Sequence, residues 1–324
     1  APRWAVWQNR GTVAFGAKSS DLGVISDIVD HTITAIETAE GHGGWCALPE
    51  GDIFAVEYWE LEQAKLGKVS NAPAFQGRCA LVTGGASGIG RSCAIALAEQ
   101  GARVTVLDKD PSVLTVFDGP DIQGRVCDVK DAQAVRESVA ESVSIFGGLD
   151  ILVNNAGIFS ASDEVADMPE EEWQRSLDIN LTGAMHVARE SIPYLKLGWD
   201  PSVIIVGSKN VPAPGPAAGA YSVAKAGLTQ LARVLALELA ADGIRVNTVH
   251  PNAVFDTAIW TDEVLEGRAA HYGMSVEDYR KNNLLRQEVT SADVAAVICA
   301  MAGSAFRCTT GAQLPIDGGN ERVL

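Results

Sequence analysis

Apolar residues in this chain follow two successive patterns that meet near residue 76. Beyond that point, short continuous apolar runs alternate with stretches whose apolar residues recur at helical spacing. Continuous apolar strands separated by helices are typical of a parallel sheet covered on both faces. We therefore predict that residues 77–324 form one doubly wound α/β domain. The runs assigned to its strands are 79–83, 104–107, 149–153, 203–206 and 244–249.

Residues 1–76 show a different pattern. Short apolar runs on either side of a glycine turn predict a hairpin over residues 4–16. Apolar positions at helical spacing predict a helix over residues 20–40 and another within 52–66. Residues 67–77 are rich in Gly, Ser, Asn and Pro, which indicates a linker. We expect a small N-terminal α+β appendage rather than an independent domain.

The acidic composition narrows the class of protein. The 324 residues carry a formal net charge of −16, which argues against non-specific binding to nucleic acid or to anionic membranes. No apolar run reaches the roughly 18 residues that a membrane-spanning helix needs, and the N-terminus lacks the pattern of a signal peptide. We expect a soluble cytoplasmic enzyme. Since the chain begins Ala-Pro-Arg without Met, we also expect a piece of a longer polypeptide.

The six cysteines indicate packing rather than chemistry. They are scattered, without a Cys-x-x-Cys pair or a His cluster at zinc-ligand spacing. Four of them lie in apolar-rich segments, where a reduced Cys behaves as a small hydrophobe. No metal site is predicted.

A glycine-rich turn follows the first strand of the predicted domain and leads directly into a helix. A pyrophosphate must approach the backbone N–H groups at a helix N-terminus, and side chains larger than Gly block that approach. Glycine turns are common, but this position between strand and helix is specific and predicts dinucleotide binding in a Rossmann fold. The turn residues expected at the cofactor are Thr83, Gly84, Ser87, Gly88, Ile89 and Gly90.

The second strand ends at Asp108, about 20 residues beyond the glycine turn. A carboxylate there hydrogen-bonds the adenosine ribose and repels a 2′-phosphate, so NAD is expected as the cofactor and NADP is less favoured. Lys109 and Arg91 lie close in sequence and weaken this preference. The alternative is that Asp108 only forms the turn before Asp110-Pro111.

Residues 208–225 carry the candidate active centre. A predicted strand brings Ser208 to its end, and three prolines then prevent regular structure until a helix opens near Tyr221. Tyr221 and Lys225 are four residues apart, so a helix places both on one face, where an ammonium would stabilise a phenolate. This spacing predicts a general base with its activator. Alone, it also fits an ordinary amphipathic helix, and the surrounding motifs must decide.

Taken together, these motifs make residues 76–323 resemble a short-chain dehydrogenase/reductase. The glycine turn matches the cofactor turn of that family, Asp128-Val129 matches its adenine-contacting pair, and residues 154–157 match its Asn-Asn-Ala-Gly after the fourth strand. Asp317 to Gly319 match its closing Asp-Gly-Gly. The resemblance implies a homodimer or homotetramer, and further cofactor contacts from Asp128, Val129, Asn155, Ala156, Gly157, Tyr221 and Lys225.

The resemblance also implies an active-site tetrad of Asn180, Ser208, Tyr221 and Lys225. In the role it implies, Tyr221 removes the proton of a substrate hydroxyl while a hydride passes to the nicotinamide. Lys225 lowers the pKa of the phenol and holds the nicotinamide ribose. Ser208 orients the substrate oxygen, and Asn180 supports a proton-relay water.

One departure from the family follows the sixth strand, where Pro251-Asn252 replaces the usual Pro-Gly. Asn tolerates unusual backbone angles, so the turn is expected to survive. The neighbouring His250 is assigned a structural role. Substrate choice is placed in residues 252–286, with a purely structural insertion as the alternative. The side chains expected to form a helical lid there are Trp260, Tyr272, Met274 and Tyr279.

A narrower resemblance points to the dehydrogenase half of bifunctional rhamnulose-phosphate aldolase/alcohol dehydrogenase proteins. It rests on residues 57–65, 208–211, 259–261 and 269–273. Residues 1–66 resemble the C-terminal end of the class II aldolase domain that precedes the dehydrogenase in such proteins. Arg10-Gly11 stands where the aldolase has a metal-binding His-Gly, so we expect no aldolase activity from this chain. The segment is expected to pack on the dehydrogenase domain or on a neighbouring subunit.

The predicted function is an NAD-dependent hydride transfer on a small hydroxyl or carbonyl substrate, such as a sugar-derived alcohol or lactaldehyde. An NADPH-dependent ketoacyl-type reductase is one alternative, and Asp108 argues against it. A nucleotide-sugar epimerase has a different glycine spacing. A catalytically silent nucleotide-binding scaffold would require a degraded tetrad, whereas all four residues are present.

Overall fold

The structure is a computed structural model that divides into two compact units, Ala1–Gly77 and Arg78–Leu324. Among the described residues, every helix is too short or too polar to cross a lipid bilayer. The structure describes residues 3–16, 18–57, 73–160 and 163–320.

The first unit begins with the hairpin predicted from the sequence. Strands β1 (Trp4–Trp7) and β2 (Gly11–Ala14) pair antiparallel, with Trp4 opposite Ala14. Helix α1 (Ser19–Glu40) covers the predicted helix, and α2 (Glu50–Glu57) begins two residues before the second predicted one. The remainder of that prediction, and the linker up to residue 72, lie outside the described residues.

The second unit contains a seven-stranded sheet with the order β5-β4-β3-β6-β7-β8-β9, in which every pairing is parallel. The order runs outward from β3 in both directions, so the chain reverses its course between β3 and β6. Open α/β sheets bind ligands at the carboxyl ends of the strands beside such a reversal. The strands are β3 (Cys79–Thr83), β4 (Arg103–Asp108), β5 (Ile122–Val126), β6 (Ile151–Asn154), β7 (Ser202–Val206), β8 (Arg245–Pro251) and β9 (Gln313–Ile316).

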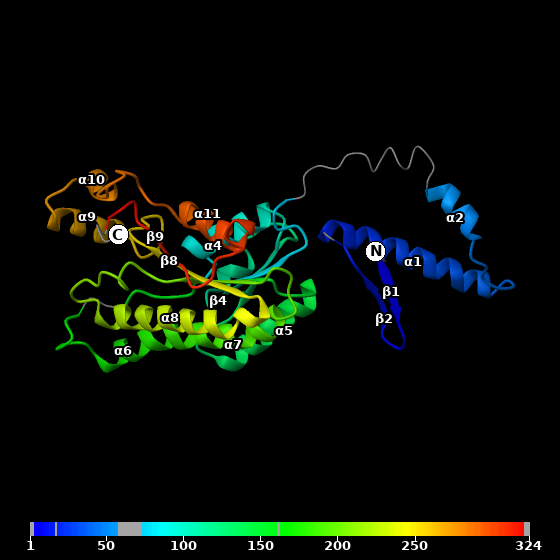
Figure 1. Ribbon diagram of the computed structural model, residues 1–324, viewed down its shortest axis with the longest axis horizontal. Coiled ribbons are helices and arrows are strands. Elements are labelled where there is room, and N and C mark those ends of the chain that lie inside the picture. Colours follow the sequence, from blue (N-terminus) through cyan, green and yellow to red (C-terminus); the bar gives the residue numbers. More distant parts are fainter. Residues whose placement is uncertain (1–2, 17, 58–72, 161–162, 321–324) are drawn as a thin grey trace. The chain divides into compact units, whose positions relative to one another are not determined.

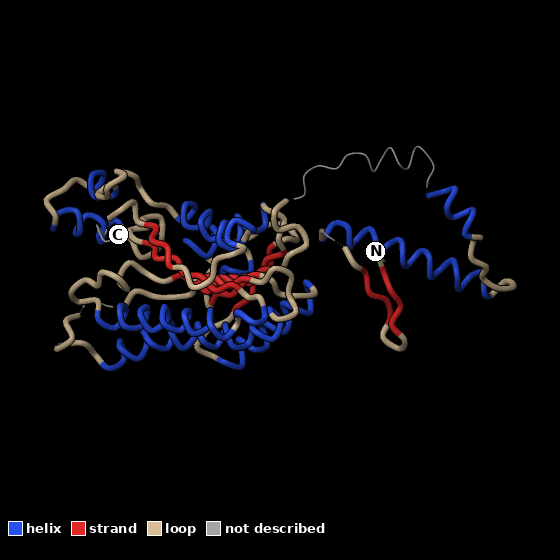
Figure 2. Tube along the Cα trace, viewed as in Figure 1, coloured by secondary structure: helices blue, strands red, loops and turns tan. Residues whose placement is uncertain are grey.

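Helices cover both faces of this sheet, which confirms the predicted doubly wound α/β class. Figure 1 shows α4 and α11 over one face and α5, α7 and α8 over the other, and Figure 2 shows the strands between the two helical layers. The strands are fully buried where both layers cover them, as β3 and β7 show. These helices are α4 (Gly88–Glu99), α5 (Ala132–Phe146), α7 (Ala184–Leu195), α8 (Gly219–Glu238) and α11 (Ser291–Ala302).

Shorter helical elements complete the unit. Helix α6 (Glu170–Leu177) continues through a π-helical turn, Asp178–Gly183, into α7. Helices α9 (Asp262–His271) and α10 (Val276–Arg280) lie in the segment after β8. Single 3₁₀ turns occur at Pro111–Leu114, Ala240–Asp242 and Ser304–Phe306.

Two strands, β5 and β9, were not predicted. They form the two edges of the sheet, where one side of each strand has no neighbouring strand. Edge strands are less buried, so their sequences need fewer apolar residues. Strand β5 reads Ile-Gln-Gly-Arg-Val and has no fully buried residue. Strand β9 contains Pro315 in its interior, where a proline weakens the sequence signal for a strand.

Candidate active site

The glycine turn connects β3 to α4 at the carboxyl edge of the sheet. Gly84 and Gly88 have positive φ angles of 67° and 52°, which favour glycine. A Cβ atom on Gly84 would lie 2.7 Å from Cα of Ala156, and one on Gly90 would overlap the carbonyl oxygen of Gly84. These glycines therefore let the turn fold onto itself and against the segment after β6.

Thr83 and Asn155 hold the turn in place. The Thr83 hydroxyl accepts hydrogen bonds from the backbone N–H groups of Asn155 and Ala156, both at 3.0 Å. The Asn155 amide donates to the carbonyl oxygens of Thr83 and Gly84, both at 2.9 Å. Both predicted cofactor residues thus fix the shape of the site with their side chains.

Asp108 reaches the glycine turn from the end of β4. Its carboxylate accepts hydrogen bonds from the backbone N–H of Ala86 at 3.0 Å and from that of Asp110 at 2.9 Å. Asp108 thus forms the local turn and also lies beside the glycine turn, a position compatible with both sequence interpretations.

The arrangement suits a dinucleotide. Helix α4 begins at Gly88, with Ser87 as N-cap, and among the described residues the Ser87 side chain caps none of the first-turn N–H groups. Those N–H groups and the helix dipole suit a pyrophosphate, and the fixed carboxylate of Asp108 suits a ribose. Ile89 lies within the same first turn.

The predicted adenine-side pair follows β5 at the same edge of the sheet. The carboxylate of Asp128 accepts from the backbone N–H of Lys130 at 3.0 Å. Val129 is buried against the π-helical turn, where a Cβ on Gly183 would lie 2.6 Å from its Cγ2. The structure therefore brings this pair beside β4 and its terminal Asp108.

Ser208, Tyr221 and Lys225 come together at the end of β7. Ser208 is buried, and its hydroxyl accepts from the backbone N–H of Asn210 at 3.2 Å. The Ser208 side chain also lies close enough to the Tyr221 phenol to affect its pKa. The Lys225 ammonium lies 5.9 Å from the centre of the Tyr221 ring and donates to the carbonyl of Val206 at 2.9 Å. Helix α8 thus presents Tyr221 and Lys225 on one face, as the spacing predicted.

The pKa of Tyr221 differs from the sequence-based expectation. Burial raises it above its usual value, and the Ser208 hydrogen bond lowers it by less. Burial also lowers the pKa of Lys225 to about 8, because the ammonium has lost its hydration. Lys225 therefore does not bring the phenol to a low pKa, and Tyr221 keeps its phenolic proton at neutral pH.

Asn180 lies in the π-helical turn between α6 and α7 and is fully buried. Its amide oxygen accepts from the N–H of Ile158 at 3.0 Å, and its amide nitrogen donates to the Ile158 carbonyl at 3.1 Å and to the Ser176 hydroxyl at 3.2 Å. A Cβ on Gly157 would lie 2.7 Å from that amide oxygen and 3.3 Å from the Lys225 nitrogen. Gly157 therefore marks the point where Asn180 and Lys225 approach each other. Isolated π turns often occur at functional sites.

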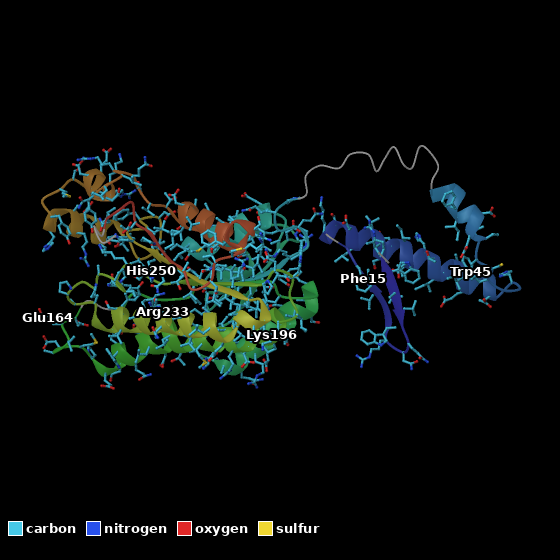
Figure 3. All side chains as sticks on the ribbon, in the orientation of Figure 1. Phe15, Trp45, Glu164, Lys196, Arg233 and His250 are labelled. Atoms are coloured by element: carbon cyan, nitrogen blue, oxygen red, sulfur yellow. The ribbon has the colours of Figure 1, made fainter. Side chains whose placement is uncertain are left out.

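His250 supports the backbone of Ser208. Its Nδ1 lies 3.2 Å from the Ser208 nitrogen and 3.0 Å from the Ser208 oxygen, and its Nε2 lies 3.0 Å from the side-chain oxygen of Gln313. Burial lowers its pKa, which favours the neutral ring. Figure 3 places His250 at the sheet, between the two helical layers.

The turn after β8 was only partly anticipated. The residue with positive φ is Ala253, at 51°, and not Asn252. The turn carries Thr257 to the glycine turn, where a Cβ on Gly88 would lie 3.1 Å from its Cγ2. Thr257 is thus a site residue that sequence reasoning missed, and its only sequence signal is its place shortly after Pro251.

The segment after β8 contains two helices, and all four of its Phe, Trp and Tyr side chains form one cluster. The rings of Phe255 and Trp260 lie 4.8 Å apart, those of Trp260 and Tyr279 6.2 Å apart, and Tyr272 stacks on Tyr279 at 5.8 Å. Phe255 had not been named as a member. Met274 is 38% exposed.

This fold and this site define a class, that of nucleotide-binding oxidoreductases. A family model described as Enoyl-(Acyl carrier protein) reductase matches residues 84–321, and one described as Aldolase class II, second domain, matches residues 1–66. The chain belongs to the short-chain dehydrogenase/reductase family, whose members bind nicotinamide cofactors.

Individual relatives agree with this assignment. The uncharacterized oxidoreductase YuxG of Bacillus subtilis is 34% identical over 340 residues, which cover 98% of this chain and 48% of YuxG. The chain thus spans about half the length of that relative. The (-)-trans-carveol dehydrogenase of Rhodococcus erythropolis is 33% identical over 273 residues, which cover 75% of this chain and 97% of the relative.

A solved structure shows the same fold. The 3-ketoacyl-(acyl-carrier-protein) reductase from Brucella melitensis, complexed with NADH, matches with a TM-score of 0.67 and 27% identity. The match covers 75% of this chain and 98% of that one.

Proposed function

We propose that this chain is an NAD-dependent oxidoreductase that interconverts a small hydroxyl compound and its carbonyl form. The observation that carries the proposal is the meeting of Ser208, Tyr221 and Lys225 at the end of β7, on the edge of the sheet that holds the glycine turn. The nicotinamide, when bound, accepts or gives the hydride.

In this proposal the side chains of the protein transfer the proton of the substrate hydroxyl. Ser208 hydrogen-bonds the substrate oxygen, and Tyr221 gives its phenolic proton to that oxygen in the reductive direction. In the oxidative direction Tyr221 must lose that proton first, which its raised pKa opposes. Lys225, at 5.9 Å from the ring, favours the phenolate, and Asn180 supports a relay of that proton toward solvent.

The cofactor preference for NAD is supported by Asp108. Two backbone N–H groups hold its carboxylate in one orientation at the end of β4. The carboxylate would therefore repel the 2′-phosphate of NADP at this position. The NADH complex of the Brucella melitensis reductase shows that a relative of this fold takes the same cofactor.

A ketoacyl-type reduction is the second candidate, favoured by the description of that same relative. Because that ketoacyl reductase is itself complexed with NADH, cofactor preference alone does not separate the two candidates. Measured dissociation constants for NADH and NADPH test the cofactor, and turnover of a small alcohol compared with that of a 3-ketoacyl thioester tests the reaction.

For the substrate we propose a sugar-derived alcohol or a hydroxyaldehyde such as lactaldehyde. The match of residues 1–66 to a class II aldolase domain supports an upstream aldolase domain that releases such a product. Oxidation of an aldehyde would proceed on its hydrate, since no cysteine falls on a matched catalytic position and a thioester route needs one.

The proposal includes a cytoplasmic homodimer or homotetramer that acts on a small molecule and binds neither nucleic acid nor membrane. Its test is a screen for NAD reduction with small polyols, deoxy sugars, hydroxy acids and lactaldehyde. Turnover with one class supports it. Measurable NAD binding without turnover on any class would favour a silent scaffold instead.

A further inference from the structure

Lys209 directly follows Ser208 and leads away from the catalytic centre. Its backbone N–H donates to the Pro251 carbonyl at 3.1 Å, which ties it to the end of β8. Its half-buried ammonium donates to the side-chain oxygen of Asn320 at 2.7 Å. The residue beside the catalytic serine is thus bonded to a turn 111 residues further along the chain.

Asn320 uses the other end of its amide to reach the segment that follows α10. Its Nδ2 donates to the carbonyl of Asn282 at 2.6 Å. Its own backbone is held by the turn, since its N–H donates to the Asp317 carbonyl at 3.1 Å. One amide therefore bridges Lys209 on one side and Asn282 on the other.

A second set of contacts joins residues 283–285 to the turn that contains Gly318 and Gly319. The N–H of Leu285 donates to the Gly318 carbonyl at 3.0 Å. Gly318 has a φ of 64°, and a Cβ on it would lie 2.5 Å from the side chain of Asn283. A Cβ on Gly319 would lie 3.0 Å from Leu284. Only glycine allows this approach, so residues 282–285 lie directly on the turn.

Residues 282–285 end the segment that carries α9, α10 and the aromatic cluster. The segment is therefore anchored at both ends near the site, at Thr257 against the glycine turn and at Asn282 through Asn320. The last described residues lie on the side of the unit where α9 and α10 are found (Figure 1).

We propose that Lys209 is a positioning residue that acts through Asn320 to set how closely the α9–α10 segment closes over Ser208, and thereby which substrates fit. The substrate part of this inference rests on the proposed function. A charge-assisted hydrogen bond suits this role because it is short and directional. A substrate too large for the set distance would have to break the bridge.

The two halves of the bridge can be removed separately. Lys209→Met keeps the length of the side chain but removes the donor to Asn320. Asn320→Asp keeps the acceptor for Lys209 and removes the donor to Asn282. The matched control is Lys281→Met, because Lys281 pairs with the exposed Glu277 on the same segment and not with the turn.

The first readout is hydrogen–deuterium exchange of the full chain with NAD added, over peptides that cover residues 282–286. Both bridge variants should exchange about tenfold faster there, as expected for the loss of one net hydrogen bond, and Lys281→Met should match the wild type. Unchanged exchange in both bridge variants would overturn the proposal. Lys209→Arg, which keeps a cationic donor, should restore protection if Lys209→Met folds poorly.

The second readout uses the best alcohol from the substrate screen. In Lys209→Met and in Asn320→Asp, we expect the KM for that alcohol to rise about tenfold, kcat to stay within about twofold, and the KM for NAD to stay unchanged. Lys281→Met should match the wild type. The double variant should be no worse than either single one, and additive effects would contradict the bridge. If the wild type turns over none of the compounds, the proposed function fails, whereas the exchange experiment still decides the bridge.

Discussion

Lys225 carries an ammonium group that is buried away from water. It is 3% exposed, and its ammonium donates to the Val206 carbonyl. Burial lowers its pKa from 10.5 to about 8, so below pH 8 the folded state holds a proton that the unfolded state would hold more tightly. The lysine that we propose activates the site therefore weakens the fold.

We accordingly predict that Lys225→Met raises the free energy of unfolding by about 1–3 kcal/mol at pH 7 while it abolishes turnover. The gain should shrink as pH rises from about 8 to 10.5, where the lysine becomes neutral in both states. Urea unfolding at several pH values measures it. A variant that is less stable than the wild type at pH 7 would contradict the burial argument.

His250 affects the free energy of unfolding at the acidic end of the pH range. Its pKa is lowered from 6.5 by burial, so below pH 6.5 the unfolded chain takes up a proton more readily than the folded one. The free energy of unfolding should therefore fall with pH below 6.5, by up to about 1.4 kcal/mol per unit, until the folded pKa is passed. His250→Gln should flatten this part of the curve. An unchanged slope would show that other groups set it.

Gly157 should tolerate no side chain, for reasons of space alone. An added Cβ would lie 2.7 Å from the Asn180 oxygen and 3.3 Å from the Lys225 nitrogen. We predict that Gly157→Ala lowers kcat by about 10- to 100-fold, since small displacements of reacting groups have effects of that size. Gly148→Ala is the control, because a Cβ there meets nothing within 4 Å. Steady-state kinetics of both variants, with equal melting temperatures as a check on folding, would measure it.

At the scale of the element, the sequence predicts what continuous burial dictates. Strands β3 and β7 read as apolar runs because helices cover both of their faces, and their ends correctly located Thr83 and Ser208. The edge strand β5 escaped because a Gly and an Arg sit in it. Edge pairing depends on a neighbour's backbone, which leaves no apolar signature in the strand itself.

The sequence did not predict the π-helical turn or the bridge from Lys209, for another reason. A π turn inserts one residue into a helix without a marked change in composition, so Asn180 could be assigned only by resemblance. Asn320, which accepts from the Lys209 ammonium, lies 111 residues away in sequence, where local patterns carry no information. Motif spacing picks out the candidate reacting groups, and tertiary contacts determine what surrounds them.

Two buried threonines on neighbouring strands allow a matched test of the turn. The Thr83 hydroxyl accepts from two backbone N–H groups, whereas that of Thr105 on β4 has no hydrogen-bond partner among the described residues. Thr83→Val should lower the free energy of unfolding by about 1–3 kcal/mol and weaken NAD binding, since it leaves those N–H groups unpaired. Thr105→Val should be neutral or stabilising. Equal losses in the two variants would mean that the Thr83 bonds contribute little.

At the scale of the whole molecule, the first unit differs from the second in where its apolar side chains lie. Helix α1 buries Ile25 and Val29, yet Trp7 and Phe54 are each 61% exposed. The second unit has a continuous core on both faces of its sheet. Exposed apolar area of this kind often marks a surface that contacts another protein or domain. Residues 1–66 match a family model described as Aldolase class II, second domain.

A chain that begins at Pro73 should therefore keep the fold and activity of the second unit, with Phe75, which is 1% exposed, retained. We expect its melting temperature to stay within a few degrees of the full chain and its binding of the dye ANS to fall, because the exposed apolar groups are gone. Calorimetry and dye fluorescence measure both. A truncated chain that no longer folds would show that the second unit needs the first.

The strand order has a consequence for how the chain reaches its native state. Strand β3 pairs with β4 only 24 residues later, as Cys79 opposite Arg103 shows, but its other edge waits for β6, where Ala80 meets Ile151. During synthesis this fully buried strand thus has one open edge until some seventy further residues have emerged, about the separation of Ala80 from Ile151. An open apolar edge pairs readily with another chain, and parallel sheets with distant partners form slowly. Refolding yield should therefore fall as protein concentration rises, and dilution or a chaperone that shields the nascent strand should restore it.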